Sequence, residues 1–375
     1  MSTEFEPARL DDVEELLALF RLQYGDSYPL PSGTDPEMMA AAIANPIPSW
    51  LVARDNGRIV TTIMAEIAAE DRIARTQSLI VHPDARGRGM ARKAVGALAD
   101  LLLTSGHIDS AYGKSRTSST AAQRMMLSND FTALGVFPNA HKFASQETVL
   151  LTVKHAEGVL DRRQPVYKVP AELERLIDAV EHSVGMPVRP EFVPATDYPI
   201  AGPDVELELV DAPHFVARTF DEQVRDPYRR YYPLHTPNML LTDAKGTFEL
   251  YARLTKHDGY GTMIAGTPDG LTVVPYLGQI VRMLSEAGAA YLETIVPLCA
   301  FEELSALLAH GFLPAAMYPA MRRDGDLFQD YVVMARTMQP LDFRGLKIDE
   351  AFRPYAEQYI DLWTQRHLDT SGVFR

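Results

Sequence analysis

The residues best suited to chemistry lie in a short basic, glycine-rich segment, 86–91, which reads Arg-Gly-Arg-Gly-Met-Ala. It separates an apolar, strand-like stretch from a helical pattern. A strand, a glycine loop and a helix in this order direct the unpaired N–H groups of the first helical turn toward the loop, where the helix dipole is positive. Gly87 and Gly89 allow the backbone to approach an anion closely, and Arg86 and Arg88 add charged donors. The segment predicts a site for the pyrophosphate of a cofactor.

Two common nucleotide loops do not fit this segment. No Gly-Lys-Ser/Thr block follows it, so it is no Walker A motif, and G-x-G-x-x-G is absent. Arg86–Ala91 instead resembles the [Q/R]-x-x-G-x-[G/A] loop of the GNAT (GCN5-related N-acetyltransferase) superfamily. The preceding Val81-His82-Pro83 and the following amphipathic helix match that family as well. The resemblance implies acetyl-CoA or another acyl-CoA as the cofactor.

The resemblance also implies which residues hold that cofactor. In the family, the strand before the loop splays from its neighbour, and its free backbone groups pair with the pantetheine arm. Ser119 occupies a position where the family often has an asparagine that contacts the cofactor. The expected cofactor-binding residues are therefore Leu79, Ile80, Val81, Arg86, Gly87, Arg88, Gly89, Met90, Ala91 and Ser119.

The usual catalytic groups of the family are not found at the matching positions. A glutamate on the central strand commonly acts as base, but the stretch there reads Thr76-Gln77-Ser78. A tyrosine on a later short helix commonly acts as acid, but Met126 stands there and cannot donate a proton. The alternatives are Glu66 on the neighbouring strand, water held by Gln77 and Ser78, or tyrosines after the first helix. The catalytic candidates are Glu66, Gln77 and Ser78, and the candidates for substrate binding are Tyr24 and Tyr28.

Composition limits the class of protein. With 375 residues, 46% of them hydrophobic and 23% charged, the chain predicts a two-domain globular protein. The net charge of −14 argues against a nucleic acid as partner and is compatible with a cationic amine acceptor. No apolar run of about 20 residues predicts a membrane span, and residues 1–5 do not resemble a signal peptide. The single cysteine, Cys299, is expected to be buried and fits a cytoplasmic location; no metal site is expected, and a homodimer is possible.

The order of expected elements divides the chain into four parts. Residues 1–155 read β-α-α-β-β-β-α-β-α-β-β, which resembles the GNAT order. Residues 156–204 are a proline-rich connector with one helix, over 171–182, and residues 339–375 are a C-terminal tail with one helix, over 354–365. Residues 205–338 repeat the pattern more weakly. The expected fold is α/β (α+β), with two GNAT-like domains, each a mixed, mostly antiparallel sheet flanked by helices.

The second repeat departs from the first where chemistry matters. Before its central helix, expected over 273–287, stands Gly266-Thr267-Pro268-Asp269-Gly270, with a carboxylate and no arginine. This half is expected to be a degenerate domain that does not bind CoA as the first half does.

Three functions fit these observations. The first is an acyl-CoA-dependent N-acyltransferase that transfers the acyl group directly, in a ternary complex, to a small amine or amino-acid-like acceptor. The second is a non-catalytic acyl-CoA-binding sensor or regulatory protein, suggested by the missing base and acid. The third is an aminoacyl-tRNA-dependent transferase, a chemistry also found on doubled GNAT-like folds.

Overall fold

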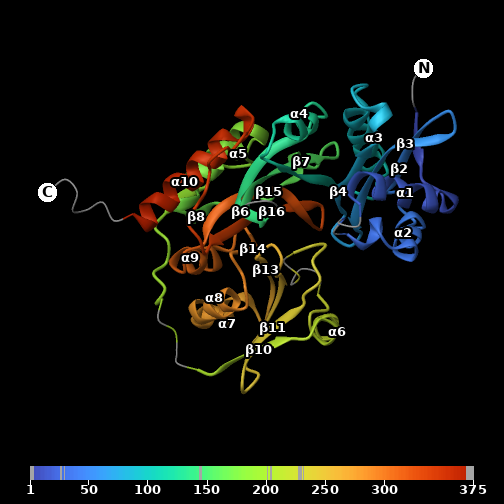
Figure 1. The fold of residues 1–375 in the computed structure, drawn as a ribbon. Coiled ribbons are helices and arrows are strands. Elements are labelled where there is room, and N and C mark those ends of the chain that lie inside the picture. The colour runs from blue at the N-terminus through green and yellow to red at the C-terminus, as the bar shows by residue number, and fades with distance from the viewer. Residues whose placement is uncertain are drawn as a thin grey trace. The chain divides into compact units, whose positions relative to one another are not determined.

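The computed structural model describes residues 4–25, 28, 30–142, 146–200, 202, 205–226, 230 and 232–368 (Figure 1). The chain divides into two compact units. Unit 1 comprises Met1–Lys114, Ala121–Thr132 and Thr152–Glu157, and unit 2 comprises Ser115–Thr120, Ala133–Leu151 and Gly158–Arg375.

The strands of unit 1 follow the order β1-β2-β3-β4-β5, with β4 and β5 parallel and the other neighbours antiparallel. Asn56-Gly57 closes the β2–β3 hairpin with both residues at positive φ. The strands are β1 Phe5–Pro7, β2 Trp50–Asp55, β3 Arg58–Ala68, β4 Ile73–Val81 and β5 Ser110–Arg116. Strand β5 and the next two strands, β6 Thr132–Lys142 and β7 Gln146–His155, have residues in both units.

Helices cover both faces of this sheet, and each face has its own core. The helices are α1 Val13–Tyr24, α2 Pro36–Ile43, α3 Met90–Thr104 and α4 Ala121–Leu127. Leu16 and Phe20 of α1 and Met39 of α2 pack against Trp50 and Ile80 on one face. On the other face the core contains Ala94, Val95, Leu98, Ala99 and Leu102 of α3 with Met126 of α4. The sheet therefore holds β4 between two apolar layers.

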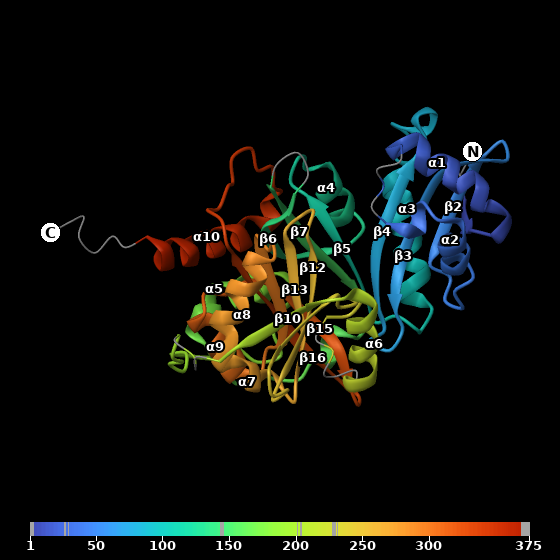
Figure 2. The same cartoon turned by 60° about the horizontal axis from the view of Figure 1, so that its bottom comes forward.

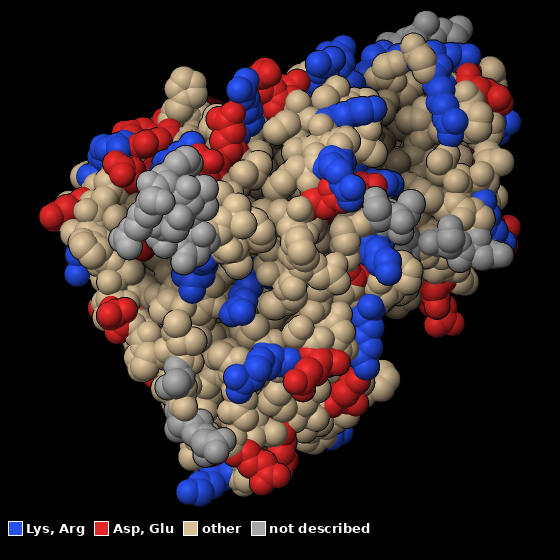
Figure 3. Space-filling model, turned by 60° about the vertical axis from the view of Figure 1, so that its left-hand side comes forward, with Lys and Arg blue, Asp and Glu red and all other residues tan. Residues whose placement is uncertain are grey.

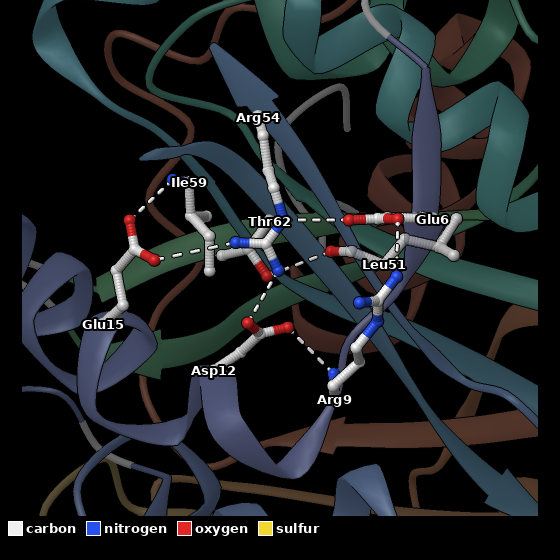
Figure 4. A network of polar contacts seen from close by, with 8 residues as sticks. All are labelled: Glu6, Arg9, Asp12, Glu15, Leu51, Arg54, Ile59 and Thr62. Atoms are coloured by element: carbon white, nitrogen blue, oxygen red, sulfur yellow. Dashed lines mark hydrogen bonds and ion pairs between the residues drawn. The ribbon is translucent and has the colours of Figure 1, made fainter. Parts of the chain in front are cut away.

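A polar network attaches the N-terminal segment to this sheet (Figure 4). The guanidinium of Arg54 contacts Glu6 Oε1 at 2.8 Å and Asp12 Oδ1 at 2.6 Å, and it lies 3.7 Å from Glu15 Oε2. Glu15 also accepts a hydrogen bond from the backbone N–H of Ile59 at 2.6 Å. These carboxylates raise the pKa of Arg54, chiefly through the hydrogen bonds with Glu6 and Asp12. The network fixes the start of α1 against β2 and β3.

The strands of unit 2 follow the order β7-β6-β15-β16-β14-β13-β12-β11-β10. The pair β13–β14 is parallel, and β14 pairs antiparallel with β16. A Cβ atom on Gly135 of β6 would lie 2.1 Å from that of Ala316 on β15, so this strand contact requires glycine. The strands are β10 Leu207–Asp211, β11 Met239–Asp243, β12 Glu249–Thr255, β13 Tyr260–Thr267, β14 Tyr291–Pro297, β15 Leu313–Asp324 and β16 Leu327–Thr337.

Helices flank the sheet of unit 2 as well. Figures 1 and 2 both show α7 and α8 on one side of β11–β13 and α6 on the other. The C-terminal helix α10 contacts α5 and β15. A short parallel pair, β8 Lys168–Pro170 and β9 Glu191–Val193, precedes the repeat. The helices are α5 Glu174–Val184, α6 Pro213–Gln223, α7 Gly270–Val273, α8 Leu277–Glu286, α9 Phe301–Ala309 and α10 Arg353–His367.

Several sequence expectations need correction. The strand β11 and the pair β8–β9 were not expected, and the single helix expected over 273–287 is divided into α7, a 3₁₀ turn and α8. Cys299, expected to be buried, is exposed. Residues 133–151, expected within a first domain of 1–155, belong to unit 2 by their contacts; the four sequence-based domain limits stay predictions.

Two surface properties bear on possible partners. Within the described ranges, no helix combines the length and the apolar character that crossing a membrane requires. Figure 3 shows basic and acidic side chains interspersed with uncharged ones over the face in view.

Candidate functional site: a glycine loop beside a divergent strand

Strand β4 contains a bulge at Ser78. Its register against β3 shifts between the pairs Thr62–Ile80 and Met64–Gln77, so that two residues of β4 oppose one of β3. Ser78 has a φ of +58°, a left-handed conformation that non-glycine residues seldom adopt. The bulge turns the strand and redirects its side chains at this point.

Strand β4 separates from β5 just before the bulge. The parallel pairing ends at Arg75–Tyr112, although β4 continues to Val81 and β5 to Arg116. At the fork, the hydroxyl of Thr76 donates to the carbonyl of Tyr112 at 3.1 Å. The later part of β4 thus has a backbone edge without a ladder partner in β5, as far as the structure describes both strands. An extended ligand chain can pair with such an edge.

The loop after β4 is built around two glycines in the left-handed region. A 3₁₀ turn, Pro83–Ala85, follows the strand, and His82 Nδ1 accepts from the N–H of Asp84 at 3.2 Å. Gly87 and Gly89 then have φ values of +76° and +74°. Gly89 is the N-cap of α3, and no side chain within the described ranges caps this helix. The N–H groups of the first turn are therefore available to an anion.

The two loop arginines lie at the surface with weak or neutral partners. Arg86 donates to Gln23 Oε1 at 2.6 Å and to the carbonyl of Val81 at 3.4 Å. Arg88 lies 3.4 Å from Asp55, and its side chain is 62% exposed. An exposed pair at this distance contributes little to stability. Both guanidinium groups can consequently reorient toward a bound anion at low cost.

The structure brings Ser78 and Tyr28 together. Their hydroxyl oxygens lie 2.6 Å apart, although 50 residues separate them in the chain. The ring of Tyr28 contacts those of Tyr24 and Phe20, each at a centroid distance of 4.8 Å. Burial raises the pKa of Tyr28, partly offset by the hydrogen bond with Ser78. Tyr28 therefore keeps its proton at neutral pH and can relay it.

The side chain of Glu66 is already engaged. It forms an ion pair with Arg75, which lies directly opposite on β4, and it is 40% exposed. Gln77 pairs with Met64, whose side chain lies in the core under α1 and α2. The register thus assigns Gln77 to the sheet face that Tyr28 contacts.

The remaining residues expected at the site differ in which groups they could present to a ligand. Ile80 is buried in the core beneath α1 and α2, and Leu79 packs against the core of α3, so both can contribute only backbone groups to a ligand. Met126 is a core residue. Ser119 is exposed and belongs to the stretch 115–120, which packs with unit 2; its contact with the cofactor stays a prediction.

Sequence reasoning missed three features of the site. The Thr76–Tyr112 contact, the bulge at Ser78 and the bond from Arg86 to Gln23 all depend on neighbours distant in sequence. Only the bond from Arg86 to Gln23 had a local signal in the sequence, because Gln23 is a polar residue in the last turn of an amphipathic helix.

Comparison with known proteins identifies the type of domain that residues 13–131 form. This stretch, about a third of the chain, matches the acetyltransferase (GNAT) family. No curated protein is significantly similar to the chain.

Among solved structures, similar ones include a GNAT acetyltransferase from Streptococcus pneumoniae, at 17% identity, 41% coverage of this chain, 99% of that chain and a TM-score of 0.37. The ribosomal-protein-alanine N-acetyltransferase from Brucella melitensis is 18% identical, with 40% of this chain and 99% of that chain covered and a TM-score of 0.36. A phosphinothricin acetyltransferase from Sinorhizobium meliloti, solved in complex with AcCoA, is 16% identical. Of this chain 42% is covered and of that chain 91%, with a TM-score of 0.37.

Proposed function

We propose, from the premise that residues 13–131 form an acetyltransferase (GNAT) domain, that the chain is an acyl-CoA-dependent N-acyltransferase acting on a small amine or amino-acid-like acceptor. One observation carries this proposal. The uncapped N-terminus of α3, with its two left-handed glycines, follows directly after the edge of β4 that β5 leaves unpaired. An anion site and an extended-chain site are therefore adjacent, as a ligand with a pyrophosphate at the end of a long amide chain requires.

The cofactor is held by backbone more than by side chains. The N–H groups at 87–91 receive the pyrophosphate, and Arg86 and Arg88 supply the positive charge. The pantetheine amides pair with the free edge of β4 at 79–81. The thioester then lies toward the bulge at Ser78. Acetyl-CoA is the donor that the family implies.

The acyl transfer needs little from the side chains beyond positioning and proton movement. The amine nitrogen of the acceptor attacks the thioester carbonyl carbon, the C–S bond breaks, and the CoA thiolate leaves with the proton that the amine gives up. We assign the transfer of this proton, from the amine to the leaving thiolate, to water held by Gln77 and the Ser78–Tyr28 pair, because Glu66 is occupied by Arg75. Tyr24, beside Tyr28, contacts the acceptor.

Unit 2 is proposed to be a degenerate GNAT-like domain. Its strands β10-β11-β12-β13-β14-β16-β15 follow the same order as β1-β2-β3-β4-β5-β7-β6, and the parallel pair stands at the same place in both. This correspondence supports a duplicated fold. The absence of arginine from residues 266–270 supports the loss of CoA binding.

A second function is favoured by a specific observation. Met126, at the position of the family's usual acid, is packed in the core, and Glu66 is ion-paired. A protein that binds acyl-CoA without transferring the acyl group, a sensor, fits these two facts. An aminoacyl-tRNA-dependent transferase is less compatible with a net charge of −14.

The proposal is tested by thiol release from acetyl-CoA in the presence of a panel of amines. We expect turnover with at least one amine, and a loss of kcat of about 10²-fold in Ser78→Ala and in Tyr28→Phe, since each removes one member of the proton relay. Acetyl-CoA binding should be unchanged in both variants. The control is Tyr167→Phe, at an exposed tyrosine of unit 2. Binding of acetyl-CoA without turnover of any amine would favour the sensor.

A further inference from the structure

The fork between β4 and β5 closes at a buried glycine, Gly113 of β5, directly after the last paired residues of the two strands. A Cβ atom on Gly113 would lie 2.7 Å from Oγ1 of Thr76, on β4, and 2.6 Å from Cε of Met126, on α4. Both distances are too short for a real Cβ atom. The space that a side chain at 113 would take is therefore filled by the ends of Thr76 and Met126.

The backbone that carries Met126 is held against α3. The side-chain amide of Asn129, just after α4, donates to the carbonyls of Arg92 at 3.0 Å and Met125 at 2.9 Å. Gly96 of α3 permits this approach, because a Cβ atom there would lie 2.7 Å from Asn129 Oδ1. Met126 itself is 5% exposed and packs in the core under α3. Since protein interiors are close-packed, its thioether can leave the fork only by displacing that core.

An acyl chain on the proposed thioester would run toward Met126. A pantetheine arm paired with β4 at 79–81 places the thioester near Ser78, and the acyl group continues along β4 toward Thr76. On the face of α1 and α2, the hydroxyls of Ser78 and Tyr28 lie 2.6 Å apart, and an alkyl chain there would remove water from two polar groups. The chain is therefore directed to the apolar face under α3, where it meets Met126.

We propose that Met126 determines the length of the acyl chain that the protein accepts and limits the donor to short chains, acetyl or propionyl. The proposal rests on the function assigned to unit 1 and adds the class of donor to it. The terminal methyl group of Met126 occupies the space that the outer carbons of a butyryl group would need. This gives a role to a side chain that has no proton to donate.

Calorimetric titration of the full chain with CoA, acetyl-CoA and butyryl-CoA tests the proposal without an acceptor. We expect the wild type to bind butyryl-CoA about tenfold more weakly than acetyl-CoA, because overpacking at the fork is unfavourable. In Met126→Ala, butyryl-CoA should bind more tightly than acetyl-CoA, by roughly fourfold for each added methylene that enters the space. The matched control is Met39→Ala, which removes an equally large side chain from the core under α1 and α2 and should keep the wild-type ratio.

Two further variants keep the test decisive if Met126→Ala does not fold. Met126→Leu conserves volume but reaches only as far as the sulfur position, which lies 3.8 Å from the Cβ site of Gly113. It should shift the ratio of affinities toward butyryl-CoA, in the same direction as alanine and by a smaller factor. Gly113→Ala narrows the fork instead, and should weaken acetyl-CoA about fivefold more than it weakens CoA. Thermal unfolding checks that each variant is folded.

Two outcomes would overturn the limit set by Met126: the same ratio of butyryl-CoA to acetyl-CoA affinity in the folded Met126 variants as in the wild type, or an equal change of this ratio in Met39→Ala. Either result leaves the acyltransferase proposal standing, provided that the wild type binds CoA and acetyl-CoA. A wild type that binds neither ligand would overturn both proposals, so the two failures are distinguishable.

Discussion

Gly89 sits at the junction of loop and helix with a φ of +74°, and a Cβ atom there would meet no heavy atom within 4 Å. Its requirement for glycine is thus conformational, and alanine would cost about 1–2 kcal/mol in this left-handed conformation. We expect Gly89→Ala to shift the loop away from this conformation, misalign the first N–H groups of α3 and weaken acetyl-CoA binding about tenfold. Titration calorimetry measures the change.

A matched control exists at the other end of the same helix. Gly106 has a φ of +73° and equally open surroundings, two residues beyond the end of α3. Gly106→Ala should lower the melting temperature as much as Gly89→Ala does while leaving acetyl-CoA affinity unchanged. Equal affinities in the two variants would show that the loop conformation has no part in binding.

At the scale of elements, the β15–β16 hairpin buries a carboxylate. Asp330 accepts from the N–H of Ala320 at 2.7 Å and lies 3.6 Å from Arg163. Burial raises the pKa of Asp330 to about 6, against the lowering effect of Arg163. The unfolded value is near 3.8, so the folded state binds this proton more tightly. Its contribution to stability is complete below the unfolded pKa and is lost as the pH rises through about 6.

Asp330→Asn removes this dependence. We expect the unfolding free energy of the wild type, relative to the variant, to fall by on the order of 2–3 kcal/mol between about pH 4 and about pH 7. Urea unfolding at the two pH values measures it. Asp326→Asn, in the exposed turn of the same hairpin, is the control and should show no such slope. A difference that is constant with pH would contradict the burial argument.

At the scale of the whole molecule, each unit has a pair of parallel strands that separate, β4–β5 in unit 1 and β13–β14 in unit 2. The segments that follow β4 and β13 differ in charge. The fork in unit 1 ends at a loop with two arginines, and the fork in unit 2 ends at a helix capped by Asp269. We therefore expect one acetyl-CoA per chain. The double variant Arg86→Ala, Arg88→Ala should abolish this binding, whereas Arg344→Ala, at an arginine that is 92% exposed, should not affect it. A calorimetric stoichiometry of two would contradict the assignment.

Local patterns were sufficient for much of the architecture. The sequence predicts strands over 58–68, 73–81 and 327–337, and β3, β4 and β16 have these limits, because turn residues or loops bound each of them. The expected α+β class and the acetyltransferase domain near the N-terminus are confirmed as well. The short strand β11 was missed because a run of only five residues, Met239–Asp243, is too short for its pattern to distinguish a strand from a loop.

The sequence by itself determined the loop that we propose for the cofactor, since its consecutive glycines, arginines and helix start are local in the chain. Only the tertiary structure decided what surrounds it. The bulge at Ser78, the partner of Tyr28 and the pairing of Glu66 with Arg75 arise from strand register and packing between distant segments. A change of one residue in register would send these side chains to the other face of the sheet, and no short stretch of sequence encodes that choice.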